Sequence, residues 1–174
     1  EQSRNKDHLS DFFNTYLQDE YGPSQTIVAE QAYNIVHSLE RYNHDADCDM
    51  FLKILMGELP EQSFVDQQLL LQHLQDKIIK LDRSENQGIQ TGKIDKQIFL
   101  ACLRKCVPCK SVTRMEELQQ ALFYDCGGPV KNVNYIDVFQ DDHEGNQGKF
   151  VEAMRDQYLE ESIEYSNELV EALE

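Results

Sequence analysis

The chain has 174 residues, 40% of them hydrophobic and 28% charged, which is typical of a globular protein of one or two domains. Its 32 acidic residues against 16 lysines and arginines give a formal net charge of −16. This excess excludes nucleic acid and anionic membrane surfaces as expected partners, because both attract cationic side chains. No apolar run approaches the roughly 20 residues of a membrane-spanning helix. The chain begins at Glu1 with no signal-peptide pattern, so we expect a piece of a longer protein.

Three helices are predicted in the first 60 residues. Apolar residues recur at steps of three and four over 7–21, and Gly22-Pro23 ends that helix. Ser24 stands where an N-cap belongs, and a second apolar stripe continues to Tyr42. A third, short helix is predicted before Pro60.

Three aspartates open the third helix in a D-x-D-x-D run formed by Asp45, Asp47 and Asp49. Such a run could suggest a cation site, but Phe51 and Leu52 follow at once, so the helix has already begun. Acidic residues at a helix N-terminus cap it and interact favourably with its dipole. We therefore interpret this run as a helix cap.

Two apolar helix–loop–helix segments occupy the middle of the chain. The first combines a helix at 62–81, a polar loop at 82–94 and a helix at 95–106. The helix at 62–81 is so apolar that we expect it to be covered on more than one side and to lie at the centre of the core. The second segment has a helix at 112–124, a loop, and a short helix at 135–140.

The pieces GKIDKQIF and NVNYIDVF, one in each segment, resemble the end of an EF-hand loop and the start of its exiting helix. Over about residues 65–140 the chain is thus similar to the calmodulin-like EF-hand superfamily. The resemblance implies that Ile94 and Val133, one from each loop, pair with each other in a short β-ladder.

The loops depart from the EF-hand pattern at the positions that bind calcium. A working loop needs oxygen ligands at positions 1, 3 and 5 and a bidentate Glu at position 12. Asp82, Ser84 and Asn86 fit the first three positions and Asp95 is a fourth candidate, but the glycine comes too late and Ile98 falls at the last position. We therefore expect a degenerate pair that binds no metal, with residual calcium sensing through those four residues as the alternative.

The cysteines leave a second alternative open. Five are present, an odd number in a chain that does not need disulfides, so we expect a reducing, cytoplasmic compartment. Cys102, Cys106, Cys109 and Cys126 could surround zinc and make this a zinc-stabilised helical domain. The Cys106–Cys109 spacing also matches redox motifs, but no βαβ context surrounds it. We interpret the five as core or inert thiols.

The final helix, predicted at 149–173, has an apolar stripe along one face, and the rest of its surface is mostly acidic. The stripe predicts either packing on the chain's own domain or docking to a partner through Met154, Tyr158, Leu159, Ile163 and Val170. The start of a coiled coil that continues past residue 174 is a further alternative. The eight acids of the helix would repel one another unless cations screen them. Those cations could come from a basic partner or from residues 61–110, the only stretch with more basic than acidic residues.

The sequence thus predicts an all-α protein in three parts: an N-terminal helical region (1–60), a degenerate EF-hand-like pair (61–140), and a linker with an acidic amphipathic helix (141–174). No motif of a hydrolase, metalloprotease or nucleotide-binding enzyme is present, so we expect no enzymatic activity and no cofactor. The expected function is a calcium-independent interaction or scaffold module with a helical or basic protein partner. The EF-hand resemblance further suggests a cytoskeletal or ciliary assembly.

Overall fold

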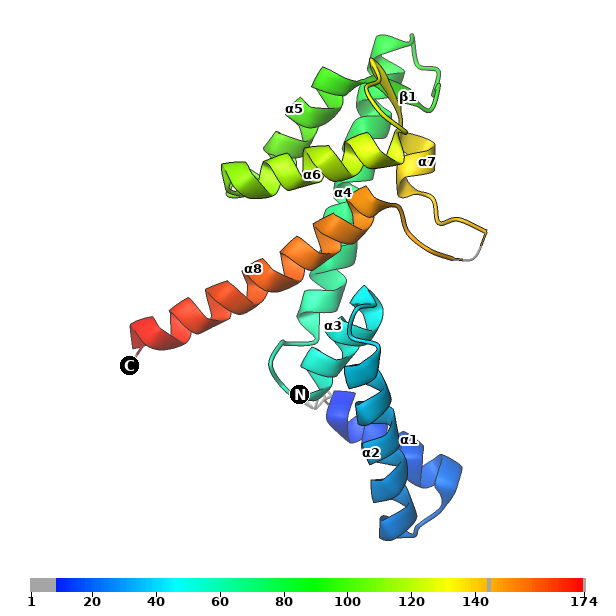
Figure 1. The fold of residues 1–174 in the computed structure, drawn as a ribbon, viewed down its shortest axis with the longest axis vertical. Helices are drawn as coiled ribbons and strands as arrows, with labels where there is room; N and C mark the ends of the chain where they lie inside the picture. The colour runs from blue at the N-terminus through cyan, green and yellow to red at the C-terminus, as the bar shows by residue number, and fades with distance from the viewer. Residues whose placement is uncertain (1–8, 144, 174) are drawn as a thin grey trace, which may run out of the picture. The chain divides into compact units, whose positions relative to one another are not determined.

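The computed structural model describes residues 9–143 and 145–173, and this part of the chain is mostly helical (Figure 1). The all-α class predicted from the sequence is confirmed, with two three-residue strands as the only sheet in the described part. The elements are α1 (Leu9–Tyr21), α2 (Gln25–Arg41), α3 (Ala46–Leu55), α4 (Gln62–Glu85), β1 (Lys93–Asp95), α5 (Lys96–Cys106), α6 (Val112–Asp125), β2 (Asn132–Asn134), α7 (Tyr135–Phe139) and α8 (Lys149–Leu173). No helix in the described part combines the length and apolar character that crossing a membrane requires.

The chain divides into two compact units. The first comprises Glu1–Phe64 and Ser162–Glu174, and the second comprises Val65–Glu161. The second unit therefore contains the first half of α8 together with the two helix–loop–helix segments. The sequence-based division had assigned the whole of 141–174 to a separate part.

In the first unit α1 packs against α2 and α3 around a small core. Leu17, Val28 and Met50 are buried, and the rings of Phe13 and Phe51 meet edge to face with centroids 6.4 Å apart. Each of the three helices contributes one buried apolar side chain to this core, so the hydrophobic stabilisation of the group is small. The predicted start of the first helix, at residue 7, lies outside the described residues.

The D-x-D-x-D run is a helix cap, as predicted. The Asp45 side chain accepts hydrogen bonds from the backbone N–H groups of Asp47 and Cys48, both at 3.0 Å. Asp47 and Asp49 lie in the first turn of α3, where negative charge is favoured by the helix dipole. Asp49 also pairs with Lys53 one turn later.

In the second unit two helix–loop–helix segments are joined by a short antiparallel ladder. β1 pairs with β2, and Ile94 lies opposite Val133, which confirms the pairing predicted from the sequence. Both side chains are buried, while their neighbours on the strands are more exposed. Figure 1 shows the two strands together beside α7, with α5 leading away from β1.

The first loop begins later than predicted. α4 continues to Glu85, so Asp82 and Ser84 lie in its last turns and not in a loop starting at residue 82. No helix breaker occurs before Gln87 (φ +54°) and Gly88 (φ +90°), whose left-handed backbone ends the helix. The helix therefore continues through a polar stretch that composition alone assigned to the loop.

One hydrophobic core holds the second unit together and includes the start of α8. Its buried members are Leu74, Ile78, Ile94, Phe99, Cys102, Leu103, Met115, Leu118, Leu122, Val133, Tyr135, Val138, Phe150, Val151 and Met154. Phe150 of α8 packs against Phe99 and Phe139, with ring centroids 5.4 and 6.0 Å apart. The apolar face of the two helix pairs is thus filled by the chain's own final helix.

This packing decides which side chains of two helices are covered. Met154 and Leu159 are 1% and 5% exposed, so these two side chains belong to the interior of the second unit and not to an open docking face. In α4, Leu74 and Ile78 are fully buried in the core, as expected for a helix covered on more than one side, whereas Val65 and Leu69 near its start are 46% and 56% exposed. Two polar side chains of α4, Gln67 and Asp82, are also buried in the second unit.

Candidate functional site

The first loop is held by the buried carboxylate of Asp82 in the last turns of α4. Its Oδ2 accepts hydrogen bonds from Thr91 N (2.7 Å), Gly92 N (3.0 Å) and the Tyr135 hydroxyl (2.6 Å). Its Oδ1 accepts from Thr91 Oγ1 (2.7 Å) and Asn86 Nδ2 (2.8 Å). We call these five residues the Asp82 anchor. The anchor joins α4, the loop and the start of α7 through one side chain.

The anchor holds Asp82 in its charged form. Burial of the carboxylate by itself raises its pKa, but the hydrogen bonds from Tyr135, Thr91 and Gly92 outweigh burial and lower the pKa to about 2. Burial and the bond to Asp82 in turn raise the pKa of Tyr135, so its hydroxyl stays a donor. Asp82 was a candidate calcium ligand, but in the structure its negative charge is stabilised by hydrogen-bond donors of the protein itself.

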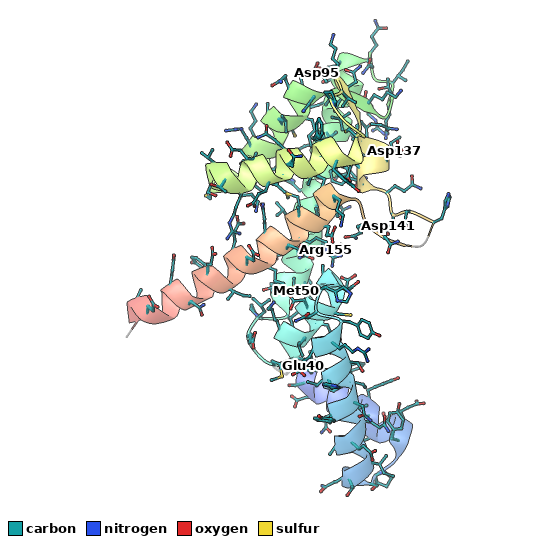
Figure 2. All side chains as sticks on the ribbon, in the orientation of Figure 1. Glu40, Met50, Asp95, Asp137, Asp141 and Arg155 are labelled. Atoms are coloured by element: carbon teal, nitrogen blue, oxygen red, sulfur yellow. The ribbon has the colours of Figure 1, made fainter. Side chains whose placement is uncertain are left out.

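The other three calcium candidates have separate local roles. Ser84 Oγ donates to the Leu81 carbonyl at 2.8 Å, and Asn86 donates to Asp82. Asp95 accepts from Gln97 N at 2.8 Å and caps α5 (Figure 2). In residues 9–143 and 145–173, no group of three or more His, Cys, Asp or Glu side chains is arranged to hold a metal ion. The four candidates therefore do not form an oxygen cage here.

Asp125, at the end of α6, performs a related task that the sequence analysis missed. Its two carboxylate oxygens accept from the backbone N–H groups of Lys149 (2.9 Å) and Phe150 (2.8 Å), which caps the N-terminus of α8. Asp82 and Asp125 both lie near the end of the first helix of their segment. That shared position was the available signal, but the partners of Asp125 lie 24 and 25 residues further along the chain.

Gly92 allows the first loop to approach the second segment closely. A Cβ at this position, where φ is +78°, would come within 2.5 Å of Ile136 Cδ1. We expect Gly92→Ala to lower the free energy of unfolding by about 2 kcal/mol, because it combines a left-handed backbone with a forced displacement of the Ile136 side chain. Gly88→Ala is the matched control, since its φ is +90° and nothing lies within 4 Å of its Cβ.

Urea denaturation of the two alanine variants measures this difference. The control should lose only about 1 kcal/mol, which is the penalty of the backbone conformation alone. Equal losses at the two glycines would contradict the close approach.

The four cysteines considered for zinc, Cys102, Cys106, Cys109 and Cys126, all belong to the second unit. In the described part of the chain they form no group of three or more potential metal ligands. Cys102 is buried, and burial together with the neighbouring Cys106 raises its pKa to about 11, so it stays a thiol at neutral pH. Burial also raises the pKa of Cys126.

The acidic final helix is screened in part by basic residues of the same unit. Lys110, with a side chain only 3% exposed, pairs with Glu161 at 2.8 Å, and Arg114 lies 3.4 Å from Glu160 and 3.6 Å from Glu161. The Arg114 guanidinium also donates to the Gln157 carbonyl at 3.2 Å, and Gln157 Nε2 donates to the Arg114 carbonyl at 3.0 Å. The expected screening by residues 61–110 is thus confirmed for Lys110, and Arg114 adds to it.

A buried polar pair joins α8 to α4 within the second unit. Arg155 Nε donates to Gln67 Oε1 at 3.0 Å, and Gln67 Nε2 donates to the Arg155 carbonyl at 3.2 Å. Both side chains are almost fully buried, and Figure 2 labels Arg155 near the start of α8. A buried guanidinium held in this way fixes the position of α8 against α4.

The five residues of α8 predicted to bind a partner differ in their exposure to solvent. Met154 and Leu159 are buried, Tyr158 and Ile163 are half-buried, and the side chain of Val170 lies outside the described part. Beyond Ile163, Tyr165 and Leu169 are 66% and 49% exposed. Partner binding through the apolar stripe stays a prediction for the half-buried residues.

A groove opens between α6 and α8 on the surface of the second unit. Its volume is about 430 Å³, and it is lined by Gln120, Ala121, Tyr124, Lys149, Glu152, Ala153 and Asp156. The wall residue Tyr124 is 71% exposed, and the two alanines pack from below against the hydrophobic core. This α6–α8 groove was not predicted, because it requires two helices that are separate in sequence.

Comparison with known proteins adds one clear similarity. The chain is 27% identical over 169 residues to the human protein named translin-associated factor X-interacting protein 1, and 26% identical over 173 residues to the mouse protein of that name. The similarity covers nearly the whole chain. Each alignment includes 97% of it but only 25% of the human and 23% of the mouse protein, so the chain spans about a quarter of these relatives. No protein-family model matches the chain, and no solved structure matches it significantly.

Proposed function

We propose that this chain is a non-catalytic protein-interaction module and that translin-associated factor X is the first partner to test. The observation that carries the proposal is the similarity, over 97% of the chain, to proteins whose name states that they interact with that factor. A net charge of −16 and a closed helical core support a surface that binds protein and not nucleic acid.

The module is a degenerate EF-hand-like pair that works without calcium. Two helix–strand–helix segments joined by antiparallel β1 and β2 support the relationship to the EF-hand superfamily. The Asp82 anchor supports calcium independence, because each of its carboxylate oxygens already accepts hydrogen bonds from loop donors. The loop is thereby ordered without a cation.

The core packing indicates where the partner does not bind. Phe150, Val151 and Met154 of α8 fill the apolar face between the helix pairs. In a calcium sensor such a face opens to receive a target helix. In this chain it is closed by the protein itself, so the partner contacts the outer surface of the unit.

The broader setting is a scaffold role in the cytoplasm, within a cytoskeletal or ciliary assembly. This part of the proposal rests on the EF-hand resemblance of residues about 65–140. Imaging of the tagged chain together with an axonemal tubulin marker tests it, and diffuse staining without marker overlap would contradict it.

Titration calorimetry of the purified chain with translin-associated factor X tests the partner. We expect saturable binding whose Kd agrees within about twofold in excess calcium, in a calcium chelator and in a zinc chelator. An unrelated helical protein of similar negative charge is the control for unspecific attraction. Absence of binding would contradict the proposed partner.

The same titration separates the two metal-dependent alternatives. Binding that requires calcium, with a calcium-induced rise in Tm that Asp82→Ala abolishes, would favour residual calcium sensing. Binding and folding lost only in the zinc chelator would favour a zinc-stabilised domain. Either result would contradict the metal-independent module.

A further inference from the structure

We propose that the α6–α8 groove is the docking site for a basic amphipathic helix of the partner protein. The inference rests on the proposed interaction function and assigns it to one surface of the second unit. It is carried by the shape of the groove, its charge and the rigidity of its walls.

The shape of the groove suits the side of a helix. Ala121 and Ala153 form a floor of small side chains, above which another backbone can approach closely. Tyr124 stands at the wall with 71% of its surface exposed, a large aromatic surface available for contact. From Lys149 to Asp156 the α8 wall extends roughly 10 Å at 1.5 Å per residue, about two helical turns. This length matches a short helical segment.

The charge of the groove selects a basic occupant. Glu152 and Asp156 place carboxylates along the α8 wall. Lys149 is the cation among the lining residues, and its ammonium already pairs with Glu152 at 2.6 Å. With two carboxylates against one ammonium, the lining keeps an excess of negative charge that attracts lysine or arginine side chains of a partner, and an arginine could also stack on Tyr124. An acidic helix would instead be repelled by the same wall.

The walls of the groove are fixed at both ends. At one end Asp125 caps α8 through the N–H groups of Lys149 and Phe150. At the other end Arg114 and Gln157 exchange hydrogen bonds between their side chains and carbonyls. A preorganised groove loses little conformational entropy on binding, which favours affinity.

Fluorescence anisotropy with a labelled synthetic peptide tests the site directly. The probe is a Leu/Lys/Arg peptide whose basic and leucine faces lie on opposite sides of a helix. Two control peptides have the same composition in scrambled order, or Glu in place of each cation. We expect the probe to bind at least about tenfold more tightly than either control. Equal binding of the scrambled peptide would overturn the proposal, because it would show unspecific attraction to an acidic protein.

Variants of the chain then locate the bound peptide. Tyr124→Ser removes the aromatic wall, and Gln120→Lys adds a cation at the edge without removing a hydrogen bond that the structure shows. Each should weaken probe binding by about fivefold or more at an unchanged Tm. Val112→Ser, at a side chain of α6 that is 70% exposed and outside the groove, and Gln72→Lys on α4 are the matched controls. Affinities within about twofold of the parent for both groove variants would overturn the proposal.

The same variants separate this inference from the proposed function. If the chain binds translin-associated factor X equally well with and without Tyr124→Ser and Gln120→Lys, the proposed docking site is contradicted and the proposed partner is supported. If the peptide binds in the groove but translin-associated factor X does not bind the chain, the proposed partner is contradicted and the proposed docking site is supported. Loss of translin-associated factor X binding in both groove variants, with both controls normal, supports the two together.

Discussion

Replacing Asp82 by asparagine is expected to lower the free energy of unfolding by about 3 kcal/mol. The side chain is fully buried and accepts hydrogen bonds from loop donors on both carboxylate oxygens. The asparagine amide cannot accept the bonds from Thr91, Gly92 and Tyr135 on its nitrogen, so buried donors are left unpaired. Urea denaturation followed by circular dichroism measures the change. Glu85→Gln, an exposed change one turn further along α4, should stay within about 0.5 kcal/mol of the parent.

Acid titration gives this prediction a second readout. The pKa of Asp82 is about 2 in the folded chain against an ordinary value of 3.8, so the folded state holds this proton less tightly. The resulting contribution of about 2 kcal/mol is fully present above pH 4 and is lost as the pH falls towards 2. Asp82→Asn should therefore reduce the loss of stability over this range. An unchanged acid dependence in the variant would contradict the anchor.

Replacing Phe150 by alanine is expected to produce the largest loss, about 4 kcal/mol. Phe150 is fully buried, and its ring lies edge to face against Phe99 and Phe139. Truncation removes buried apolar surface and leaves a cavity where α8 enters the core. Thermal and urea denaturation measure the change, and hydrogen exchange should show faster opening of the first turns of α8.

Tyr165→Ala is the matched control for that experiment. It truncates an aromatic side chain of the same helix that is 66% exposed, and it should change stability by no more than about 0.5 kcal/mol. A small effect of Phe150→Ala, similar to that of the control, would show that α8 does not complete the core.

Features set by short-range pattern were predictable. The Asp45 cap depends on N–H groups two and three residues away, and it appears in the structure as expected. The pairing of Ile94 with Val133 joins two separate loops, and it was expected from the resemblance to the EF-hand superfamily and not from local pattern alone. The end of α4 was misplaced because polar composition suggested a loop, whereas the left-handed residues that end the helix come later.

The features that could not be predicted join residues distant in sequence. Tyr135 reaches Asp82 across 53 residues, and Arg155 reaches Gln67 across 88. Taken by itself in the sequence, each of these four residues looks like an ordinary polar residue of a helix, so nothing local indicates its partner. The groove between α6 and α8 likewise exists only after both helices have packed on one core.

In the final helix, some features were determined by the sequence and others only by the tertiary structure. Its length, its apolar stripe and its acidic remainder follow from the 3.6-residue period of the sequence, so they were determined before any packing. Which residues of the stripe are covered was decided by tertiary structure, since Val151 and Met154 enter the core while Leu169 remains exposed. The period of a helix defines a face, but only the shape of the neighbouring surface determines how much of that face is removed from water.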